Sequence, residues 1–366
     1  MEIQLIKKNS RSLGQKYYTL RRRKITSVVR SFIATWKTDN AGISASNQIK
    51  LPLVNGGTYN FEVDWGDSTI DTITVWNQAE TTHTYASIGT YEVKITGTLV
   101  RWAFSNGGDK LKILNISSWG NLKFINDVGA FHGCSNLTTT ATDTPDLSDC
   151  TTMESMFNSA TNFNGAIGNW DVSNVTNMSF MFRSATTFNQ NIGTWNVSSV
   201  TNMSNMFISA IAFNQNISAW NVSSVTDMSS IFNGASVFNQ NIDAWDVSSV
   251  INMSAAFNLA TAFNQDIGIW DVSSVTNMSN MFSSSVFNQD IGNWDISNVI
   301  TMNKMFQSGT LTTTNYDLLL VGWEAQVEQP NVLFNAGTAQ YSAGASATAR
   351  AALVANGWTI TDGGQV

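Results

Sequence analysis

The sequence predicts a mainly β protein: a small N-terminal β-sandwich, a solenoid of coils of about 25 residues, and a small helical C-terminal cap. Three observations predict it: short β-branched and aromatic runs early in the chain, a 25-residue repeat after them, and an Ala-rich ending. One repeat is too small to bury its own apolar face, so stacked repeats share one core. The 366 residues divide on this basis into segments 1–24, 25–100, 101–309 and 310–366.

The composition argues against most kinds of enzyme. Charged residues make up only 12% of the chain, and there are two His and two Cys. A four-ligand zinc site of Cys and His is therefore not expected. The sequence contains no G-x-S-x-G, P-loop or G-x-G-x-x-G motif. We expect a non-enzymatic protein without a cofactor. No apolar run reaches the roughly 18 residues of a membrane-spanning helix.

Charge is unevenly distributed along the chain. Residues 1–30 carry nine basic side chains and Glu2, a net charge of +8, and the net charge of −7 leaves −15 for residues 31–366. An acidic body repels nucleic acid, which is therefore not the expected partner. Residues 1–24 are a basic arm that is either solvated or docks the body onto a larger assembly. No apolar stretch of 7–15 residues follows the basic residues, so no secretory signal peptide is predicted.

The segment 25–100 has the pattern of a β-sandwich. Its short runs FIATWKTDN, QIKLPLV, TYNFEVDWGDS, TITVW and TYEVKITGTL are separated by Gly, Asn and Asp turns. The pair Asp64 and Asp67 raises the question of acid catalysis. A W-G-D turn whose carboxylates bond their own backbone explains the pair better.

The repeats begin near residue 153, and aligned on Trp195 one unit reads WNVSSVTNMSNMFISAIAFNQNISA. We interpret their Trp, Phe and Met residues as a continuous buried column rather than a cofactor site. The I-x-x-W-x-V part predicts a short strand, and V-T-N-M-S-N-M-F predicts a helical turn. The Trp register comprises Trp170, Trp195, Trp220, Trp245, Trp270 and Trp294; the Phe registers comprise Phe182, Phe207, Phe232, Phe257, Phe282 and Phe306, and Phe163, Phe188, Phe213, Phe238, Phe263 and Phe287.

Two polar rows repeat with the same period. We expect the Asn row to be a structural ladder in which each side chain bonds the backbone of its own turn. The Asp/Asn row after Trp should face water or hold a cation, because stacked carboxylates repel one another. No calcium-loop pattern occurs, and no catalytic, cofactor-binding or metal-binding residue is assigned. The rows are Asn164, Asn189, Asn214, Asn239, Asn264 and Asn288, and Asp171, Asn196, Asn221, Asp246, Asp271 and Asp295.

The flanks of the repeats are divergent. Residues 110–152 read as earlier coils, in which Cys134 takes a buried Ala register and Cys150 a Val register. Two buried thiols are the preferred interpretation, and a disulfide between them stays open. At the other end, TTNYDLLLVGWEAQ and TARAALVANGW predict two helices, the second stopped by Asn356-Gly357. A cap of this kind covers the core that the last coil would expose.

The repeats resemble the BspA-like leucine-rich-repeat family of surface proteins, through V-T-N-M-S-N-M-F-x-x-A followed by F-N-Q-N-I-x-x-W-x-V. Segment 25–100 resembles a polycystic-kidney-disease-type (PKD) domain, through V-D-W-G-D at Val63–Asp67, His83-Thr84-Tyr85 and Gly89-Thr90-Tyr91. The resemblance implies adhesion at a cell surface, with glycans or host surface proteins as partners. It covers about residues 30–366 and leaves out the basic arm.

Several functions remain open at this point. The protein is either an adhesion protein of a cell surface or a virion component, such as a phage fibre or decoration protein, that residues 1–30 anchor to its assembly. We therefore expect an extracellular, cell-surface or virion-surface location. The alternatives are a structural spacer without a ligand and a solenoid glycosidase. A glycosidase would need two unlike carboxylates, whereas Asp246 and Asp271 belong to one repeated register.

Overall fold

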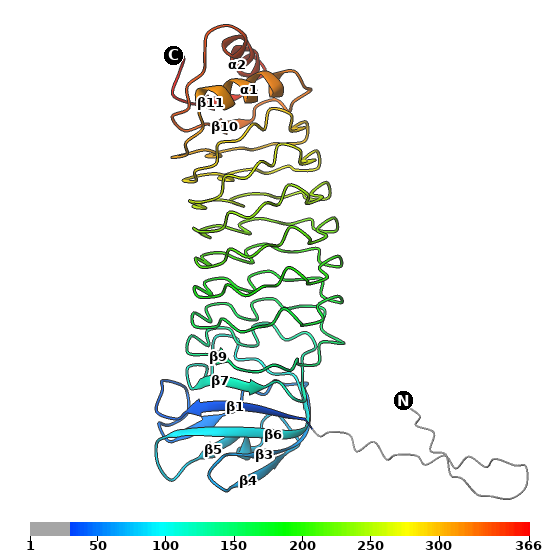
Figure 1. The fold of residues 1–366 in the computed structure, drawn as a ribbon, viewed down its shortest axis with the longest axis vertical. Coiled ribbons are helices and arrows are strands. Elements are labelled where there is room, and N and C mark those ends of the chain that lie inside the picture. The colour runs from blue at the N-terminus through cyan, green and yellow to red at the C-terminus, as the bar shows by residue number, and fades with distance from the viewer. Residues whose placement is uncertain (1–29) are drawn as a thin grey trace, which may run out of the picture.

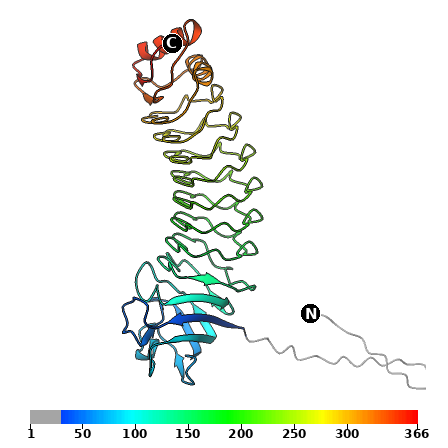
Figure 2. The same ribbon diagram turned by 60° about the vertical axis from the view of Figure 1, so that its left-hand side comes forward.

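The computed structural model describes residues 30–366, and the predicted basic arm of residues 1–24 lies outside them. The molecule is elongated: strands at one end, a pile of coils, and two helices across the other end (Figure 1). Figure 2 shows the same pile from a second side, with the N-terminal strands crossing the long axis as the coils do. Buried apolar side chains from Phe32 to Trp358 form one continuous core. In the described part of the chain, no helix is long and apolar enough to cross a bilayer.

The N-terminal strands form one large sheet and one small one. Burial alternates along the strands, as it does for Phe61 and Val63, because successive side chains point to opposite faces. The large sheet has the order β4-β3-β6-β1-β7-β9, with β8 beside β6, and β2 pairs with β5. The elements are β1 (Ser31–Lys37), β2 (Gln48–Lys50), β3 (Thr58–Asp64), β4 (Ile70–Ile73), β5 (Thr82–Thr84), β6 (Thr90–Val100), β7 (Ile113–Ser118), β8 (Leu122–Lys123), β9 (Thr138–Thr139) and a 3₁₀ turn, η1 (Ala79–Thr81).

This large sheet continues into the coils. Strand β7 pairs antiparallel with β1, with Ala34 opposite Ile116, and β9 then pairs parallel with β7. The predicted boundary between segments 25–100 and 101–309 therefore lies inside a hydrogen-bonded sheet. Among the predicted runs, β1, β2, β3 and β6 appear close to their expected positions. The run TITVW was placed too late, because β4 ends at Ile73 and residues 74–76 lie in a loop, and β5 was not predicted as a strand.

Backbone N–H groups in each coil form two kinds of hydrogen bond in alternation: one to the next coil and one within a turn of the same coil. Met153 N–H donates to Asn177 O of the next coil at 2.8 Å, and Ser155 N–H donates to Ser179 O at 2.9 Å. The Glu154 N–H between them donates to Thr152 Oγ1 at 3.2 Å, and the Met156 N–H donates to Met153 O three residues back at 3.1 Å, which closes a tight turn. This pattern places left-handed residues at two positions of each coil, for example Ser155 (φ 57°) and Ser159 (φ 58°). Every coil is thereby bonded to both neighbours.

This geometry corrects two predictions about the repeat. The predicted helical turn is wrong, because left-handed residues interrupt it and its amides reach the next coil. The predicted strand at I-x-x-W-x-V is also wrong: the parallel bridges lie five residues after this motif, as between Asn177 and Asn202. A single bridge per coil suffices because the turn amides supply the remaining bonds between coils.

Aromatic rings form the predicted column. Phe182 and Phe207 stack across neighbouring coils with centroids 5.6 Å apart, and Phe182 also stacks on Phe188 of its own coil at 3.9 Å. One pair of Trp rings from neighbouring coils, Trp220 and Trp245, is also parallel, with centroids 6.3 Å apart. Such pairs stabilise beyond the burial of their area. The predicted shared interior of like residues is therefore present.

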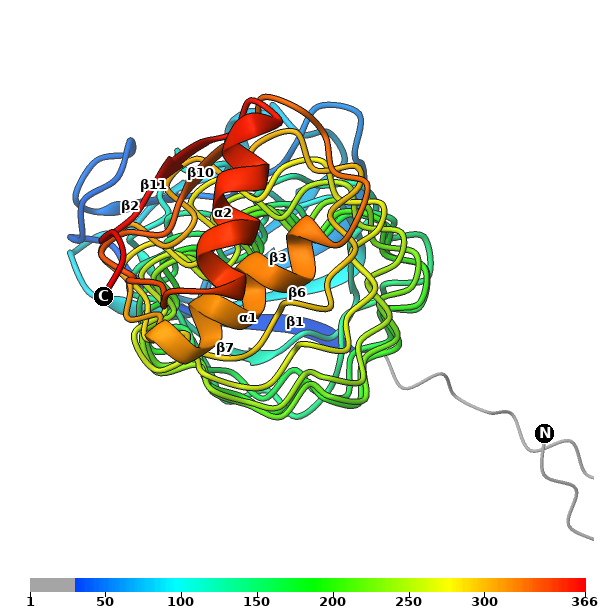
Figure 3. The same cartoon turned by 90° about the horizontal axis from the view of Figure 1, so that it is seen from above.

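The C-terminal cap comprises α1 (Thr313–Glu324), β10 (Leu333–Asn335), α2 (Ala345–Ala355) and β11 (Thr359–Thr361). Met302 of the last coil bridges to Phe334, and β10 pairs parallel with β11. Figure 3 shows both helices lying across the end of the pile. Both predicted helices are confirmed, and Gly357 (φ 90°) follows the second, where a left-handed residue ends it. Thr312 precedes α1 but bonds Asn288 rather than capping the helix.

Candidate functional site

The W-G-D segment forms the predicted turn. Asp64 Oδ1 accepts a hydrogen bond from Gly66 N–H, and Asp67 Oδ1 accepts one from Thr69 N–H, each at 3.0 Å. The interpretation as a backbone-bonding turn is therefore confirmed. Burial alone would raise the pKa of Asp67, but bonds from Thr69 and His83 hold it below its ordinary value.

His83 completes this cluster in a way that the sequence did not reveal. Its Nε2 lies 2.9 Å from Asp67 Oδ2 and 3.4 Å from Thr69 Oγ1, and its ring stacks on Trp65 with centroids 4.8 Å apart. A hydrolase triad places the nucleophile and the orienting acid on opposite ring nitrogens. Here both contact the same nitrogen, so the geometry suits a structural tie between β5 and the turn.

The Asp/Asn row faces water, as predicted. Asp171 Oδ1 accepts from Ser173 N–H at 3.1 Å and from Ser173 Oγ at 2.6 Å, and Asn196 makes the same two bonds with Ser198. The Ser173 bonds lower the pKa of Asp171. Within residues 30–366, no group of three or more potential metal-ligating side chains gathers. Each member of the row accepts from the N–H two residues ahead and so closes a local turn.

The Asn row is a ladder, but its bonds differ from those predicted. Asn164 Oδ1 accepts from Asn189 N–H at 2.9 Å and from Gln190 Nε2 at 3.0 Å, both one coil further along. The prediction that each Asn bonds its own turn is therefore wrong. The side chain instead supplies an acceptor to the amide of the next Asn. The row is structural, and it holds neighbouring coils together.

Outward hydroxyl groups donate their protons to the protein itself. Ser199 Oγ donates to Ser173 O at 2.9 Å, and Thr201 Oγ1 donates to Thr176 O at 3.3 Å, each one coil back. The lone pairs of these oxygens remain available to a partner. Residues 184–303 contain no Lys, Arg or His. They contain seven Asp residues, namely Asp227, Asp243, Asp246, Asp266, Asp271, Asp290 and Asp295. The outer surface of these coils is therefore acidic and rich in acceptors.

Both cysteines are free and buried. The open alternative of a disulfide is wrong, and the prediction of two buried thiols is confirmed. Burial raises the pKa of Cys150 to about 12, and it raises that of Cys134 well above the ordinary value. Neither thiol is therefore a nucleophile at neutral pH.

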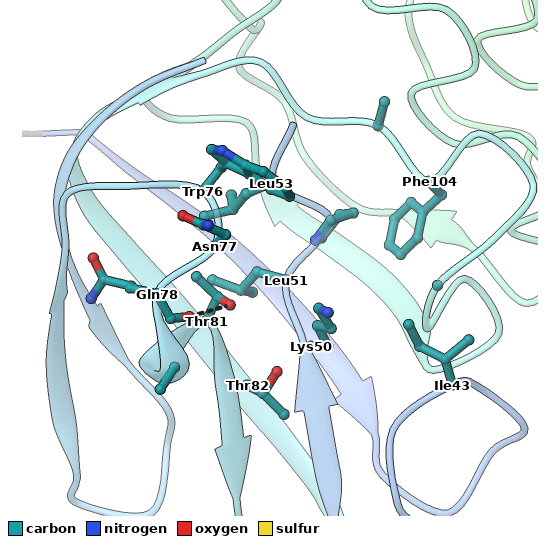
Figure 4. A pocket seen from close by; sticks show the side chains of 14 residues that line it. Ile43, Lys50, Leu51, Leu53, Trp76, Asn77, Gln78, Thr81, Thr82 and Phe104 are labelled. Atoms are coloured by element: carbon teal, nitrogen blue, oxygen red, sulfur yellow. Dashed lines mark hydrogen bonds between the residues drawn. The ribbon is translucent and has the colours of Figure 1, made fainter. Parts of the chain in front are cut away.

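A cavity of about 380 Å³ opens at the side of the N-terminal sheets. In Figure 4, Trp76 and Asn77 lie on one side and Ile43 and Phe104 on the other, with Lys50 between them. Its volume falls in the range of about 300–1,000 Å³ typical of small-ligand pockets. The cavity combines apolar surface with several polar side chains.

A buried ion pair holds one wall of this cavity. Asp109 and Lys112 are fully buried and lie 4.0 Å apart. Asp109 accepts the backbone N–H groups of Ile43 (2.9 Å) and Lys50 (2.7 Å), and Lys112 Nζ donates to Ala45 O at 2.8 Å. Burial lowers the pKa of Lys112, and Asp109 acts against that shift. The pair fixes the loop that carries Ile43 and the end of β2 that carries Lys50.

Gln78 holds the opposite wall. Its Oε1 accepts the N–H groups of Thr74 (2.8 Å) and Val75 (3.2 Å), and its Nε2 donates to Thr72 O at 2.8 Å. These bonds fix the loop that carries Trp76. The sequence did not identify Trp76, because it lies outside the repeated Trp register. An Asn-Gln pair directly after a Trp was the only local sign of it.

Comparison with known proteins places the coils in a family. The model of the family described as "Mycoplasma protein of unknown function, DUF285" matches residues 126–236 and 212–319. The two overlapping matches together span more than half of the chain. No curated protein and no solved structure matches the chain.

Proposed function

The chain belongs to the DUF285 family, and from that premise we propose that it is a non-enzymatic recognition protein that adheres to proteins or glycans on a cell surface. The observation that carries this proposal is the direction of the outer hydrogen bonds. Ser199 and Thr201 donate their hydroxyl protons to carbonyl oxygens of the preceding coil, which leaves the hydroxyl oxygens free to accept from a partner. The same arrangement recurs from coil to coil, so one partner surface can make many equivalent contacts.

The proposed architecture is a BspA-like leucine-rich-repeat solenoid with a PKD-like sandwich in front of it. The parallel bridge from Asn177 to Asn202, repeated coil after coil, supports the solenoid. The tie between Asp67 and His83, joining the W-G-D and H-T-Y motifs, supports the PKD-like unit. Stacked repeats of this kind present one extended surface to a partner.

The charge of the coils indicates the chemistry of the partner. An acidic surface rich in acceptors attracts groups that donate protons, namely Lys and Arg side chains of a protein or the hydroxyls of a glycan. Salt bridges exposed to water are individually weak and are screened by salt. Adhesion through this surface therefore depends on many contacts at once and weakens as ionic strength rises.

The test uses the full chain and the triple variant Asp246→Asn/Asp271→Asn/Asp295→Asn. Asn196 and Asn221 already form the same turns, so this variant removes charge and keeps the backbone. We expect binding to lysine-rich surfaces or host cells to fall about tenfold or more at low salt. The control variant Asp39→Asn/Glu62→Gln/Glu92→Gln removes three charges from the N-terminal sheets and should bind as the parent does.

Three results would overturn the proposal. Absence of binding to protein surfaces, glycan arrays and cells alike would favour a spacer. Binding to glycan arrays that the triple variant leaves unchanged would show that the acidic row is not the contact. Hydrolysis of a polysaccharide that is lost in Asp271→Asn would show a solenoid glycosidase.

The location we propose is the surface of a cell or of a virion. The charge contrast between residues 1–30 (+8) and residues 31–366 (−15) supports an assembly held through the arm. On the virion hypothesis, the arm docks the acidic body onto a particle and leaves the coils to contact the host. Deleting residues 1–24 should then abolish incorporation into particles, and unchanged incorporation would exclude the hypothesis.

A further inference from the structure

Trp76 stands apart from the other tryptophans of the chain. The chain has 13 Trp residues, and all of them lie in the described part. Twelve are at most 5% exposed, whereas Trp76 is 41% exposed. A large aromatic ring held at the surface loses the free energy of burial and is a common anchor for ligands. The exception lies at the mouth of the 380 Å³ cavity.

The polar groups of this cavity divide into those that hold it and those that are available. The side chain of Gln78 is hydrogen-bonded to the backbone of its own loop. The same holds for Thr81, whose Oγ1 donates to Gln78 O at 2.8 Å. In residues 30–366, the Asn77 amide and the Lys50 ammonium have no side-chain hydrogen bond or ion pair. The cavity therefore presents an indole face, an amide and a cation on a scaffold that is already fixed.

We propose that this cavity binds a sugar that carries a carboxylate, such as a hexuronate or a sialate residue of a glycan. The C–H face of a pyranose is apolar and packs on the Trp76 indole. Asn77 can both donate to and accept from the ring hydroxyls. Lys50 forms a charge-assisted bond to the carboxylate. The cavity lies outside the acidic coils, so this site does not rest on the proposed function.

The charge of the surroundings favours an anion at Lys50. Asp109 is the acidic residue that is hydrogen-bonded to Lys50. It is fully buried, and it accepts the backbone N–H of Lys50 rather than the ammonium. The carboxylate of Glu80, on the opposite side of the cavity from Lys50, accepts a hydrogen bond from Gln78 Nε2 at 3.2 Å. A neutral sugar would leave the Lys50 ammonium in water and lose that contact. Selectivity for the acidic sugar should therefore reside in Lys50.

The experiment titrates the full chain with sodium glucuronate and with N-acetylneuraminate, and with glucose as the neutral probe. Saturation-transfer NMR reports binding, and the rate of Trp oxidation by N-bromosuccinimide reports cover of the exposed indole. We expect saturable binding of an acidic sugar and slower oxidation of Trp76. Trp76→Ala should raise the dissociation constant at least tenfold, and Trp76→Phe should retain most of the affinity.

Lys50→Gln separates charge from stacking. It should raise the dissociation constant for the acidic sugar about tenfold and leave the weak binding of glucose unchanged. An exposed neighbour of Trp76 and an exposed lysine of β6 outside the cavity provide controls: Val75→Ala and Lys94→Gln should bind within about twofold of the parent. The proposal is overturned if neither acidic sugar saturates below about 20 mM, if glucose binds equally well, or if Lys50→Gln and Trp76→Ala behave as their controls do.

Discussion

Trp323 of α1 donates its indole N–H to the carbonyl oxygen of Ile291 at 3.1 Å. The coils from Trp195 to Trp294 make the same bond: Trp220 Nε1, for example, donates to Ile192 O at 3.0 Å. The helix therefore continues the Trp ladder beyond the last repeat, although Trp323 is not in the 25-residue register. The cap closes the pile by using the bond that joins the coils themselves.

The first Trp of the ladder provides a prediction. Trp170 Nε1 is buried and has no hydrogen-bond partner in the described residues, whereas Trp220 Nε1 has one. Trp220→Phe removes one of the two hydrogen bonds at Ile192 O, which keeps the bond from Trp195 N–H, and Trp170→Phe removes an unpaired donor. We expect Trp220→Phe to lower the free energy of unfolding by about 0.5–1.5 kcal/mol more than Trp170→Phe. Urea denaturation of both variants measures the difference, and equal losses would contradict the ladder.

The second prediction concerns strain at Leu259. This residue is 49% exposed and has φ 58°, a left-handed conformation that Leu disfavours and Asn tolerates. Leu259→Asn should raise the free energy of unfolding by about 0.5–1 kcal/mol. Ile269→Asn, at a 77% exposed site without positive φ, is the control and should give no gain. Equal melting temperatures for the two variants would count against the left-handed position.

The third prediction concerns the buried ion pair. Lys112→Met leaves the Asp109 carboxylate buried without its cation, which should cost about 3–5 kcal/mol. It should also abolish binding at the cavity, because the loop of Ile43 and the end of β2 at Lys50 lose their support. Thermal unfolding measures the cost. A loss below about 1 kcal/mol would show that the pair does not organise this loop.

The fourth prediction concerns acid. Burial alone would raise the pKa of Asp143, but bonds from Gly120 N–H (2.8 Å), Trp119 N–H (3.0 Å) and Ser118 Oγ hold it below its ordinary value of 3.8. A carboxylate with a lowered folded pKa stabilises the protein above its unfolded pKa, and that stabilisation is lost as pH falls through the folded pKa. Unfolding free energy should therefore fall below about pH 4, less steeply in Asp143→Asn. Identical pH profiles would refute this role.

The sequence was sufficient for the features that depend on local pattern. Phe182 and Trp195 repeat with a fixed period, and their burial follows from the inability of one repeat to cover its own core. Asp64 and Asp171 precede the turns that they bond, because a short acceptor reaches an amide two residues ahead. The helices of the cap were readable from their apolar spacing and from Asn356-Gly357.

Features that depend on distant contacts could not be predicted. Trp76 lies in an ordinary β-like run, and its exposure depends on Gln78 and on the 380 Å³ cavity that residues 43–53 and 103–108 complete. The alternating bonds of the coil resembled a helix in sequence, because apolar spacing does not report the sign of φ. Ser, Asn and Gly recur at these left-handed positions and were the available signal, but Phe180 and Leu259 obscured it.

Exchange of the 13 indole protons in D₂O, followed by NMR of the ¹⁵N-Trp-labelled full chain, tests most directly whether the coils share one interior and leave recognition to the outside. We predict one signal, that of Trp76, to vanish first, and the protons bonded between coils, such as those of Trp195 and Trp220, to persist. Coil indoles that exchange as fast as Trp76 would contradict the account.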